Sequence, residues 1–277
     1  MGRGASWQLY IWASVALGMW ASAILLTMAR PVIAVTAYKG GVGKTTLALE
    51  LASALAAVLV DLDWDRGGAT GTWGAPQPDP RLLNALTSAR ERTPRFLVRP
   101  GRPGLVPSHP DLAHVERLDP ALLATRIRSW AAAWGRPVVL DTHPGAVPLT
   151  DAAWAVADLV VVPTTIGWPE LRGLAGLLEE RASDFPLLLA PNRVRAGTVV
   201  RPQLVELMRL AREYHVPVAP PVGEHVWLSR RRLRASLVLD SDPSPRVALA
   251  ASQFRAVADA ARRAMKSLPT NPKEASA

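Results

Sequence analysis

The chain has 277 residues, 49% of them hydrophobic, so it can bury a full core and does not belong to the disordered class. It has no cysteine, which fits a reducing compartment and excludes iron–sulfur clusters held by thiolates. The formal net charge of +9 fits a polyanionic partner, nucleic acid or an anionic membrane, and equally a general excess of solvated arginine.

Residues 5–29 form an uncharged segment that is long enough to span a bilayer, with Arg3 before it and Arg30 after it. Three interpretations are open: a secretory signal with a small-residue site at 21–23, a membrane anchor, or a stretch upstream of a true start at Met28. The segment is only weakly hydrophobic and Met28 leads straight into the first predicted strand. We therefore favour the start at Met28 over the anchor, and the secretory signal least.

The predicted strand at residues 32–37 is followed by a glycine-rich loop and then by the helix-period run 47–57. In this arrangement, backbone N–H groups and the helix start bind phosphate. Lys44 can then reach the β- and γ-phosphates, and the Thr45 hydroxyl can ligate Mg²⁺. Two of the chain's four lysines, Lys39 and Lys44, lie in this loop. The loop residues expected to bind nucleotide are Lys39, Gly40, Gly41, Val42, Gly43, Lys44, Thr45 and Thr46.

The loop reads K-G-G-x-G-K-T-T, with Tyr38 where the general phosphate-loop pattern has glycine. It resembles the deviant Walker A motif of the ParA/MinD group of ATPases. The resemblance implies a P-loop NTPase that uses ATP and Mg²⁺, with catalytic roles for Lys39, Lys44 and Asp63. A lysine directly before the double glycine points away from its own phosphates, and in this family it reaches those of the partner subunit.

The next predicted strand, residues 58–60, leads into Asp61 and Asp63. Ligands of open α/β sheets bind beyond the carboxyl ends of the strands, so both carboxylates should face the phosphate loop. One can assist Mg²⁺ and the other can orient a water toward the γ-phosphate, with helix or turn capping as the alternative. The run resembles the ParA signature D-x-D-P-Q-G-x-A-T, which implies that Asp63 is the hydrolytic carboxylate and begins a switch. Trp64 and Asp65 replace the usual Pro and Gln.

Helical spacing predicts helices at residues 81–92 and 119–134. Between them lie two short strand candidates, 96–98 and 105–106, in a stretch rich in arginine, proline and glycine. The proline and glycine content favours a solvated loop over a binding site there.

A buried strand at residues 137–140 is predicted to end in Asp141. An apolar strand that closes in aspartate is the Walker B arrangement, in which the carboxylate commonly holds Mg²⁺ through water. The metal residues expected are therefore Thr45, Asp61 and Asp141. The run from Asp141 onward resembles the family's D-T-P-P-G, with His143 in place of the first Pro. His143 could be a catalytic base, but a substituted turn residue is the favoured interpretation.

Asn192 follows the predicted strand at residues 186–190. In ParA-type proteins an Asn-Arg pair at this point lies beside the adenine. A side-chain amide matches the donor and acceptor edge of adenine, so Asn192 is the candidate for contact with the base. A plain turn residue is the alternative. The other predicted elements are strands at 159–163 and 217–219 and helices at 151–157, 168–181, 201–214 and 245–268.

An arginine cluster lies in the C-terminal third and comprises Arg230, Arg231, Arg232 and Arg234. It resembles the region with which partition ATPases hold non-specific DNA, and the planar guanidinium suits phosphate oxygens. A solvated charged face is the alternative.

The alternation of strands and helices predicts a doubly wound α/β fold with a mostly parallel sheet and helices on both faces. We expect an apolar segment at 1–29, one ATPase domain at 30–268 and a disordered tail at 269–277. The resemblance implies a cytoplasmic, nucleoid-associated ATPase that dimerises on ATP, binds DNA non-specifically and segregates DNA with a ParB-type partner. The alternatives are a MinD-like positioning ATPase, bound to a membrane through residues 5–29, and a small-molecule ligase or kinase.

Overall fold

A computed structural model describes residues 30–65, 68–115, 119–145, 147–195, 201–229 and 235–267. The predictions for residues 1–29, for the tail 269–277 and for the arginine cluster lie outside these ranges.

The described residues form one sheet of six parallel strands, in the order β3-β2-β4-β1-β5-β6. This confirms the predicted fold class. The strand β1, which leads into the glycine loop, lies between β4 and β5. The strands are β1 (Val32–Val35), β2 (Val58–Asp61), β3 (Gly104–Val106), β4 (Val138–Asp141), β5 (Leu159–Thr164) and β6 (Leu187–Pro191).

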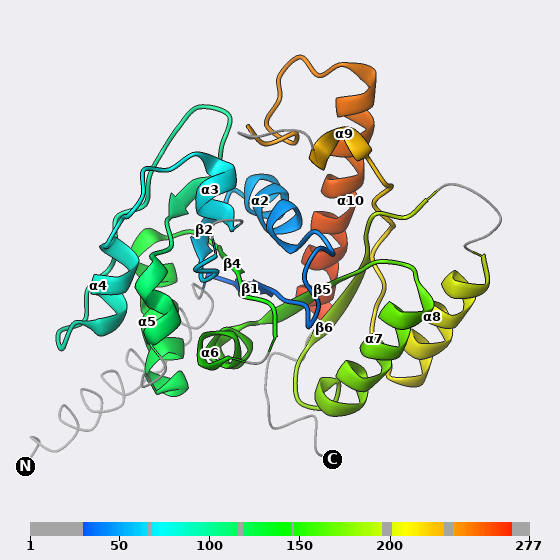
Figure 1. Cartoon of the computed structure of the whole chain (residues 1–277), viewed down its shortest axis with the longest axis horizontal. Helices are drawn as coiled ribbons and strands as arrows, with labels where there is room; N and C mark the ends of the chain where they lie inside the picture. Colours follow the sequence, from blue (N-terminus) through cyan, green and yellow to red (C-terminus); the bar gives the residue numbers. More distant parts are fainter. Residues whose placement is uncertain are drawn as a thin grey trace, which may run out of the picture.

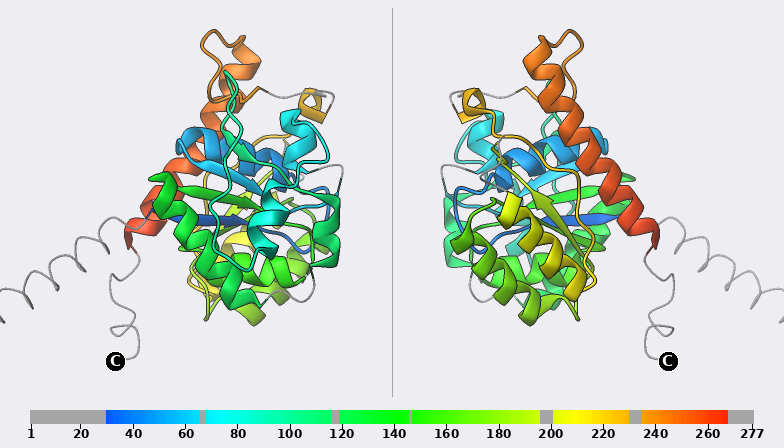
Figure 2. Two further views of the ribbon diagram at one scale, coloured as in Figure 1. Left: turned by 90° about the vertical axis from the view of Figure 1, so that its left-hand side faces the viewer. Right: turned by 90° about the vertical axis from the view of Figure 1, so that its right-hand side faces the viewer.

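Helices cover both faces of the sheet, as Figures 1 and 2 show. The helices α2, α3 and α10 pack on one face, and α4 to α8 pack on the other. The helical elements are α2 (Lys44–Ala54), α3 (Ala69–Trp73), α4 (Arg81–Thr87), the 3-10 helix η1 (Pro110–His114), α5 (Pro120–Trp134), α6 (Pro148–Val156), α7 (Trp168–Arg181), α8 (Arg201–Glu213), α9 (Val226–Ser229) and α10 (Pro245–Ser267).

The strand residues alternate between two hydrophobic clusters. On β2, Val58 and Val60 pack with the cluster beneath α4 to α8, whereas Leu59 packs with the cluster beneath α2 and α10. Both faces of a parallel sheet are covered, so its strands are apolar on both sides and read as continuous hydrophobic runs. The polar residues that end these strands therefore stand out as candidates for function.

Three predicted elements are shorter in the structure than in the sequence analysis. Helix α4 ends at Thr87 and does not continue to residue 92. The guanidinium of Arg126 donates to the carbonyl oxygens of Ala85, Leu86 and Ser88, which satisfies the helix end.

The predicted strands at 96–98 and 217–219 are single bridges, Leu97 with Leu105 and Val218 with Leu189. Prolines at 217, 220 and 221 have no N–H to extend the second ladder.

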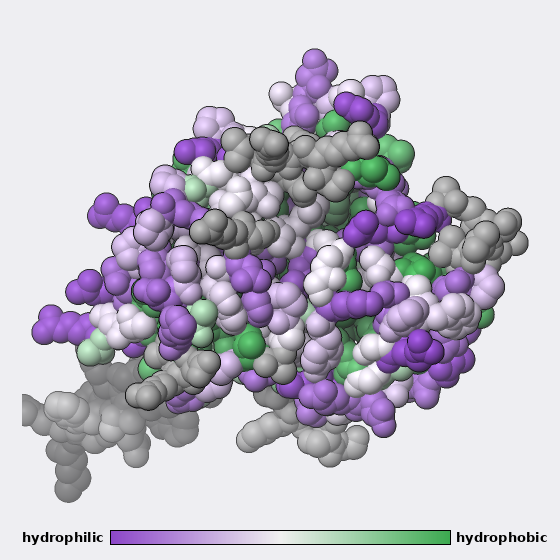
Figure 3. All heavy atoms as spheres, viewed as in Figure 1, coloured by the Kyte–Doolittle hydropathy of each residue, from purple (hydrophilic) through white to green (hydrophobic). Residues whose placement is uncertain are grey.

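Hydrophilic residues predominate on the left side of the face in Figure 3, over α4 and α5, and hydrophobic residues form smaller separate groups. None of the helices within the described ranges combines the length and the apolar character that crossing a membrane requires.

Candidate active site

The glycine loop connects β1 to α2 and turns through two left-handed glycines. Gly41 has φ +81° and Gly43 has φ +91°, a conformation that side chains rarely adopt. A Cβ on Gly43 would lie 2.4 Å from Nδ2 of Asn192, so space also requires glycine there. Gly43 is the N-cap of α2 and has no side chain to cap the helix. No side chain at the N-cap therefore competes with an anion for the start of α2.

Lys44 is the first residue of α2 and is only 6% exposed. A buried ammonium group needs negative charge nearby, and Asp141 at the end of β4 supplies part of it. The charge of Lys44 acts to lower the pKa of Asp141. The loop lysine is thus held against the strand ends that carry the aspartates.

Asp61 and Asp141 end two neighbouring strands, and the β2–β4 register places them directly opposite each other. Both are fully buried. Burial, together with the nearby Asp63 charge, raises the pKa of Asp61 to about 7, although hydrogen bonds from Thr70 oppose the rise. Burial and the Asp61 charge likewise raise the pKa of Asp141 well above its ordinary value. The pair is a buried acidic site that favours protons or a cation.

The two carboxylates differ in their hydrogen bonds. Oδ2 of Asp61 accepts from the backbone N–H and the hydroxyl of Thr70, both at 2.6 Å, and Oδ1 accepts from the N–H of Asp63 at 3.1 Å. Neither oxygen of Asp141 has a hydrogen-bond partner within the described ranges. An unpartnered buried carboxylate fits a hard cation such as Mg²⁺, which prefers oxygen ligands. Asp141 fits the predicted metal role, whereas Asp61 also supports the segment that leads to α3.

Asp63, the predicted hydrolytic residue, lies just beyond β2 and is 7% exposed. Its Oδ1 accepts from the backbone N–H of Asp65 at 3.1 Å and lies 3.0 Å from Nδ1 of His143. Sequence reasoning did not bring His143 and Asp63 together, although each follows a strand-ending aspartate by two residues. The shared offset is visible in the sequence, but it predicts the contact only once β2 and β4 are known to be neighbours.

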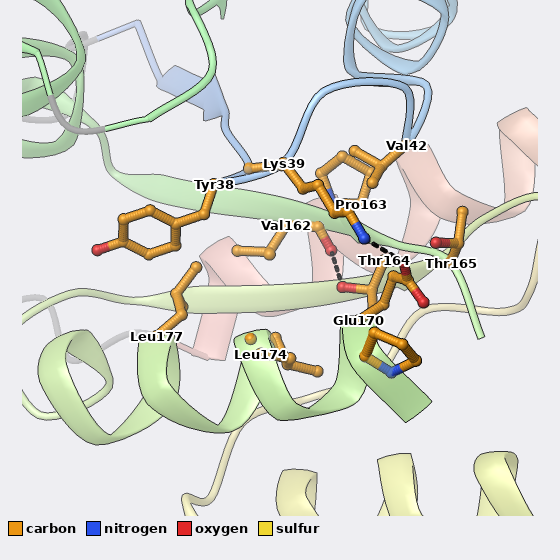
Figure 4. Close-up of a pocket in the computed structure, with 13 residues that line it drawn as sticks. Tyr38, Lys39, Val42, Val162, Pro163, Thr164, Thr165, Glu170, Leu174 and Leu177 are labelled. Carbon is orange, nitrogen blue, oxygen red and sulfur yellow. Dashed lines mark hydrogen bonds and ion pairs between the residues drawn. The ribbon is translucent and has the colours of Figure 1, made fainter. Parts of the chain in front are cut away.

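Lys39, predicted to act on a partner's phosphates, is bound within its own chain in this structure. Its Nζ lies 2.6 Å from Oε1 of Glu170, in the first turn of α7. Figure 4 shows Lys39 reaching from the loop across Pro163 and Thr164 to Glu170. A small cavity of about 70 Å³ separates the loop from α7 at this point. Lys39 therefore turns away from the Asp61–Asp141 pair.

Asn192 and Arg193, just beyond β6, hold the glycine loop. Nδ2 of Asn192 donates to the carbonyl of Val42 at 2.8 Å, and Nη1 of Arg193 donates to the carbonyl of Gly41 at 2.8 Å. Asn192 also lines a cavity of about 290 Å³ between the loop and the start of α9. The cavity adjoins the start of α2, where a nucleotide base could be accommodated. Contact between Asn192 and the base stays a prediction.

The segment at residues 236–238, which follows the arginine cluster in the sequence, is bound to α2 through Glu50. After the cluster, the Ser236 hydroxyl and the N–H groups of Leu237 and Val238 donate to the buried Glu50 carboxylate. Ser236 also donates its N–H to the carbonyl of Gly101 at 2.8 Å. The predicted DNA-binding residues 230–232 and 234 themselves lie outside the described ranges.

Comparison with known proteins adds three findings. Residues 30–182 match a family model described as an AAA domain. The chain is 37% identical over 169 residues to the chromosome-partitioning ATPase Soj of Thermus thermophilus, and 33% identical over 161 residues to the chromosome partitioning protein ParA of Myxococcus xanthus. These alignments cover 56% and 53% of this chain but only 65% and 56% of the two relatives.

Among solved structures, McdA of Cyanothece in complex with ATP superposes with a TM-score of 0.69 at 16% identity, over 87% of this chain and 98% of that one. At that identity the likeness supports the fold alone.

Proposed function

The chain belongs to the AAA domain family, whose model matches residues 30–182, and on that premise we propose that it works as a ParA-type partition ATPase. It hydrolyses ATP to ADP and phosphate with Mg²⁺, dimerises when ATP binds and holds DNA without reading its sequence. Its partner is a centromere-binding protein of the ParB type. Similarity to Soj and to ParA, both named for chromosome partitioning, supports this role.

One observation carries the proposal, the buried charges beneath the start of α2. Lys44 is 6% exposed, and neither oxygen of the fully buried Asp141 forms a hydrogen bond of normal geometry within the described part of the chain, although the Thr45 hydroxyl and the Lys44 charge act on this carboxylate. Burying a carboxylate without partners is costly, so a site of this kind is retained where a ligand completes it. A magnesium–nucleotide complex would add phosphate oxygens next to Lys44 and a cation next to Asp141.

Each residue then has a chemical task. The loop N–H groups and Lys44 bind the β- and γ-phosphates, and Thr45 and Asp141 would hold the metal ion. Bound Mg²⁺ neutralises charge on the transferring phosphoryl group. Asp63 orients the attacking water, and Lys39 contributes to the site of the partner subunit.

The arginine cluster at residues 230–234 holds DNA phosphates in this proposal, and the net charge of +9 supports a polyanionic partner. The protein then acts in the cytoplasm on nucleoid DNA. Dimerisation brings two clusters onto one surface, so DNA affinity should depend on ATP.

The test is steady-state ATPase activity of the purified chain with Mg²⁺, alone and with plasmid DNA plus the ParB-type protein encoded beside its gene. We expect Mg²⁺-dependent phosphate release that rises when both are added. Lys44→Ala is the matched control, because it removes the phosphate-binding charge and should abolish nucleotide binding.

Wild-type protein that binds no ATP, or a Lys44→Ala variant that keeps wild-type nucleotide affinity, would contradict the assignment of the loop. Turnover that neither DNA nor the partner changes would retain the ATPase and overturn the partition role.

A further inference from the structure

Three residues that depart from the ParA signature, Trp64, Asp65 and His143, meet around Asp63. His143 Nδ1 lies 3.0 Å from Oδ1 of Asp63 and 3.9 Å from Oδ2 of Asp65. The ring of Trp64 stacks on the ring of His143, with centroids 4.0 Å apart and an interplanar angle of 11°. The three substituted residues therefore form a single group of contacts around Asp63, the residue proposed to act in hydrolysis.

Sheet geometry brings these residues together. The register of β2 and β4 places Asp61 opposite Asp141 at the ends of the two strands, and Asp63 and His143 follow two residues beyond those ends. Asp63 and His143 hold the same position on neighbouring chain ends, so their side chains meet at the carboxyl edge of the sheet. The contact follows from the register itself and not from a chance approach of two loops.

The hydrogen bonds of the Asp63 carboxylate are unevenly distributed. Oδ1 has two partners, the N–H of Asp65 at 3.1 Å and the ring of His143 at 3.0 Å. An ionised carboxylate only accepts, so this contact requires the imidazole proton on Nδ1. Within the described ranges, no hydrogen bond to Oδ2 of Asp63 is formed. Oδ1 of Asp63 is therefore held by two hydrogen bonds, whereas Oδ2 can accept a hydrogen bond from a water molecule.

His143 is itself held in place. Its side chain is 18% exposed, and its backbone carbonyl accepts from the Thr150 hydroxyl at 3.2 Å. Trp64, which covers one face of the imidazole, packs in turn against the cluster beneath α4 to α8. A donor with a fixed ring plane can fix the direction of the carboxylate that it contacts.

We propose that His143 is a positioning residue for Asp63, with its Nδ1–H holding Oδ1 so that Oδ2 faces the attacking water, and with Trp64 fixing the imidazole plane. The assignment rests on the proposed ATPase function. The proline that His143 replaces has no side-chain donor. This chain therefore has a hydrogen bond to Asp63 that a proline at position 143 could not form.

Two substitutions at His143 distinguish the role of its N–H donor from that of its aromatic ring. His143→Phe keeps an aromatic ring for Trp64 but has no N–H, whereas His143→Asn keeps an amide N–H near the Nδ1 position but has no ring. We expect His143→Phe to lower kcat by roughly ten- to a hundredfold, because the carboxylate is no longer aimed. KM and nucleotide affinity should stay within about twofold, and His143→Asn should recover most of the lost kcat. His114→Phe, at an exposed position ending η1, is the matched control.

A His143→Phe protein that turns over at the wild-type rate overturns the inference and leaves the ATPase proposal standing. Equal loss in His143→Phe and His143→Asn also overturns it, since the donor would then have no special role. A fall in nucleotide affinity that accounts for the lost activity would place His143 in binding and not in positioning. Wild-type protein without turnover refutes the proposed function first, and the inference with it.

Discussion

At the scale of single residues, Asp141 should make the nucleotide-free protein less stable as the pH rises. A carboxyl in the unfolded chain titrates near its ordinary pKa of 3.8, whereas burial and the Asp61 charge raise the pKa of folded Asp141 well above it. Between these values the folded protein binds the extra proton, so the free energy of unfolding falls with increasing pH. Asp61, with a pKa raised to about 7, contributes in the same direction between about pH 4 and pH 7.

Asp141→Asn removes one of these two groups. In EDTA and without nucleotide, we expect the unfolding free energy to fall less in the variant than in wild type as the pH rises above about 4. Urea denaturation at several pH values measures it. Exposed Asp242→Asn should leave the profile unchanged. Profiles of wild type and Asp141→Asn that run parallel would show that the Asp141 carboxylate carries no such penalty.

Single residues also show how far the sequence could lead. Asp61, Asp63 and Asp141 could be placed at one edge of the sheet because each follows an apolar run, and parallel strands end together. The contact between His143 and Asp63 could not, because nothing in the sequence states that β2 and β4 are neighbours. Asp61 illustrates the same limit, since two of its three hydrogen bonds depend on how the chain turns back at Thr70.

At the scale of elements, periodicity located the main strands and helices but not their ends. The end of α4 depends on Arg126, 39 residues beyond Thr87, whose guanidinium satisfies the last carbonyls. Such a distant partner leaves no local pattern. The short helix α3, which was not predicted, follows Gly68 and packs Trp73 under Arg99 and Arg102. Its five residues are too few for a periodicity to be recognised.

The link between the glycine loop and α7 gives a prediction for these two elements. Lys39 must leave Glu170 before it can reach the phosphates of a partner subunit, so the ion pair opposes the proposed dimer. Glu170→Gln weakens this pair, which is exposed and contributes up to about 1 kcal/mol. Two such pairs break when one dimer forms, so we expect the ATP-bound dimer to form up to about thirtyfold more tightly, measured by sedimentation equilibrium.

The control for this prediction is Glu179→Gln, an exposed position on the same helix. It removes the same charge without touching Lys39, so the dimer should form as in wild type. A Glu170→Gln protein whose dimer is no tighter than that of Glu179→Gln would show that Lys39 leaves Glu170 at no cost, or does not leave it.

At the scale of the whole molecule, both sides of the sheet converge on the glycine loop. On one side, Glu50 of α2 binds the segment at residues 236–238 that follows the arginine cluster. On the other, α7 holds Lys39, and Arg193 beyond β6 holds the carbonyl of Gly41. Direct contacts thus connect the loop with Glu170 and Arg193, and connect the helix that follows the loop with the segment next to the proposed DNA-binding residues.

The last prediction concerns the dimer as a whole. If Lys39 serves the partner's site and Asp63 serves its own, Lys39→Ala and Asp63→Ala should each bind ATP but hydrolyse it slowly. In a mixed dimer, the Lys39→Ala subunit keeps its own Asp63 and receives Lys39 from its Asp63→Ala partner, so one of the two sites is complete. An equimolar mixture that pairs at random should therefore recover about a quarter of the wild-type rate. The phosphate release rate of the mixture, with mixed dimers confirmed by differential tags, makes the comparison. Mixed dimers that form yet recover no turnover would place Lys39 within its own subunit, where its contact with Glu170 would be its resting position and also its working one.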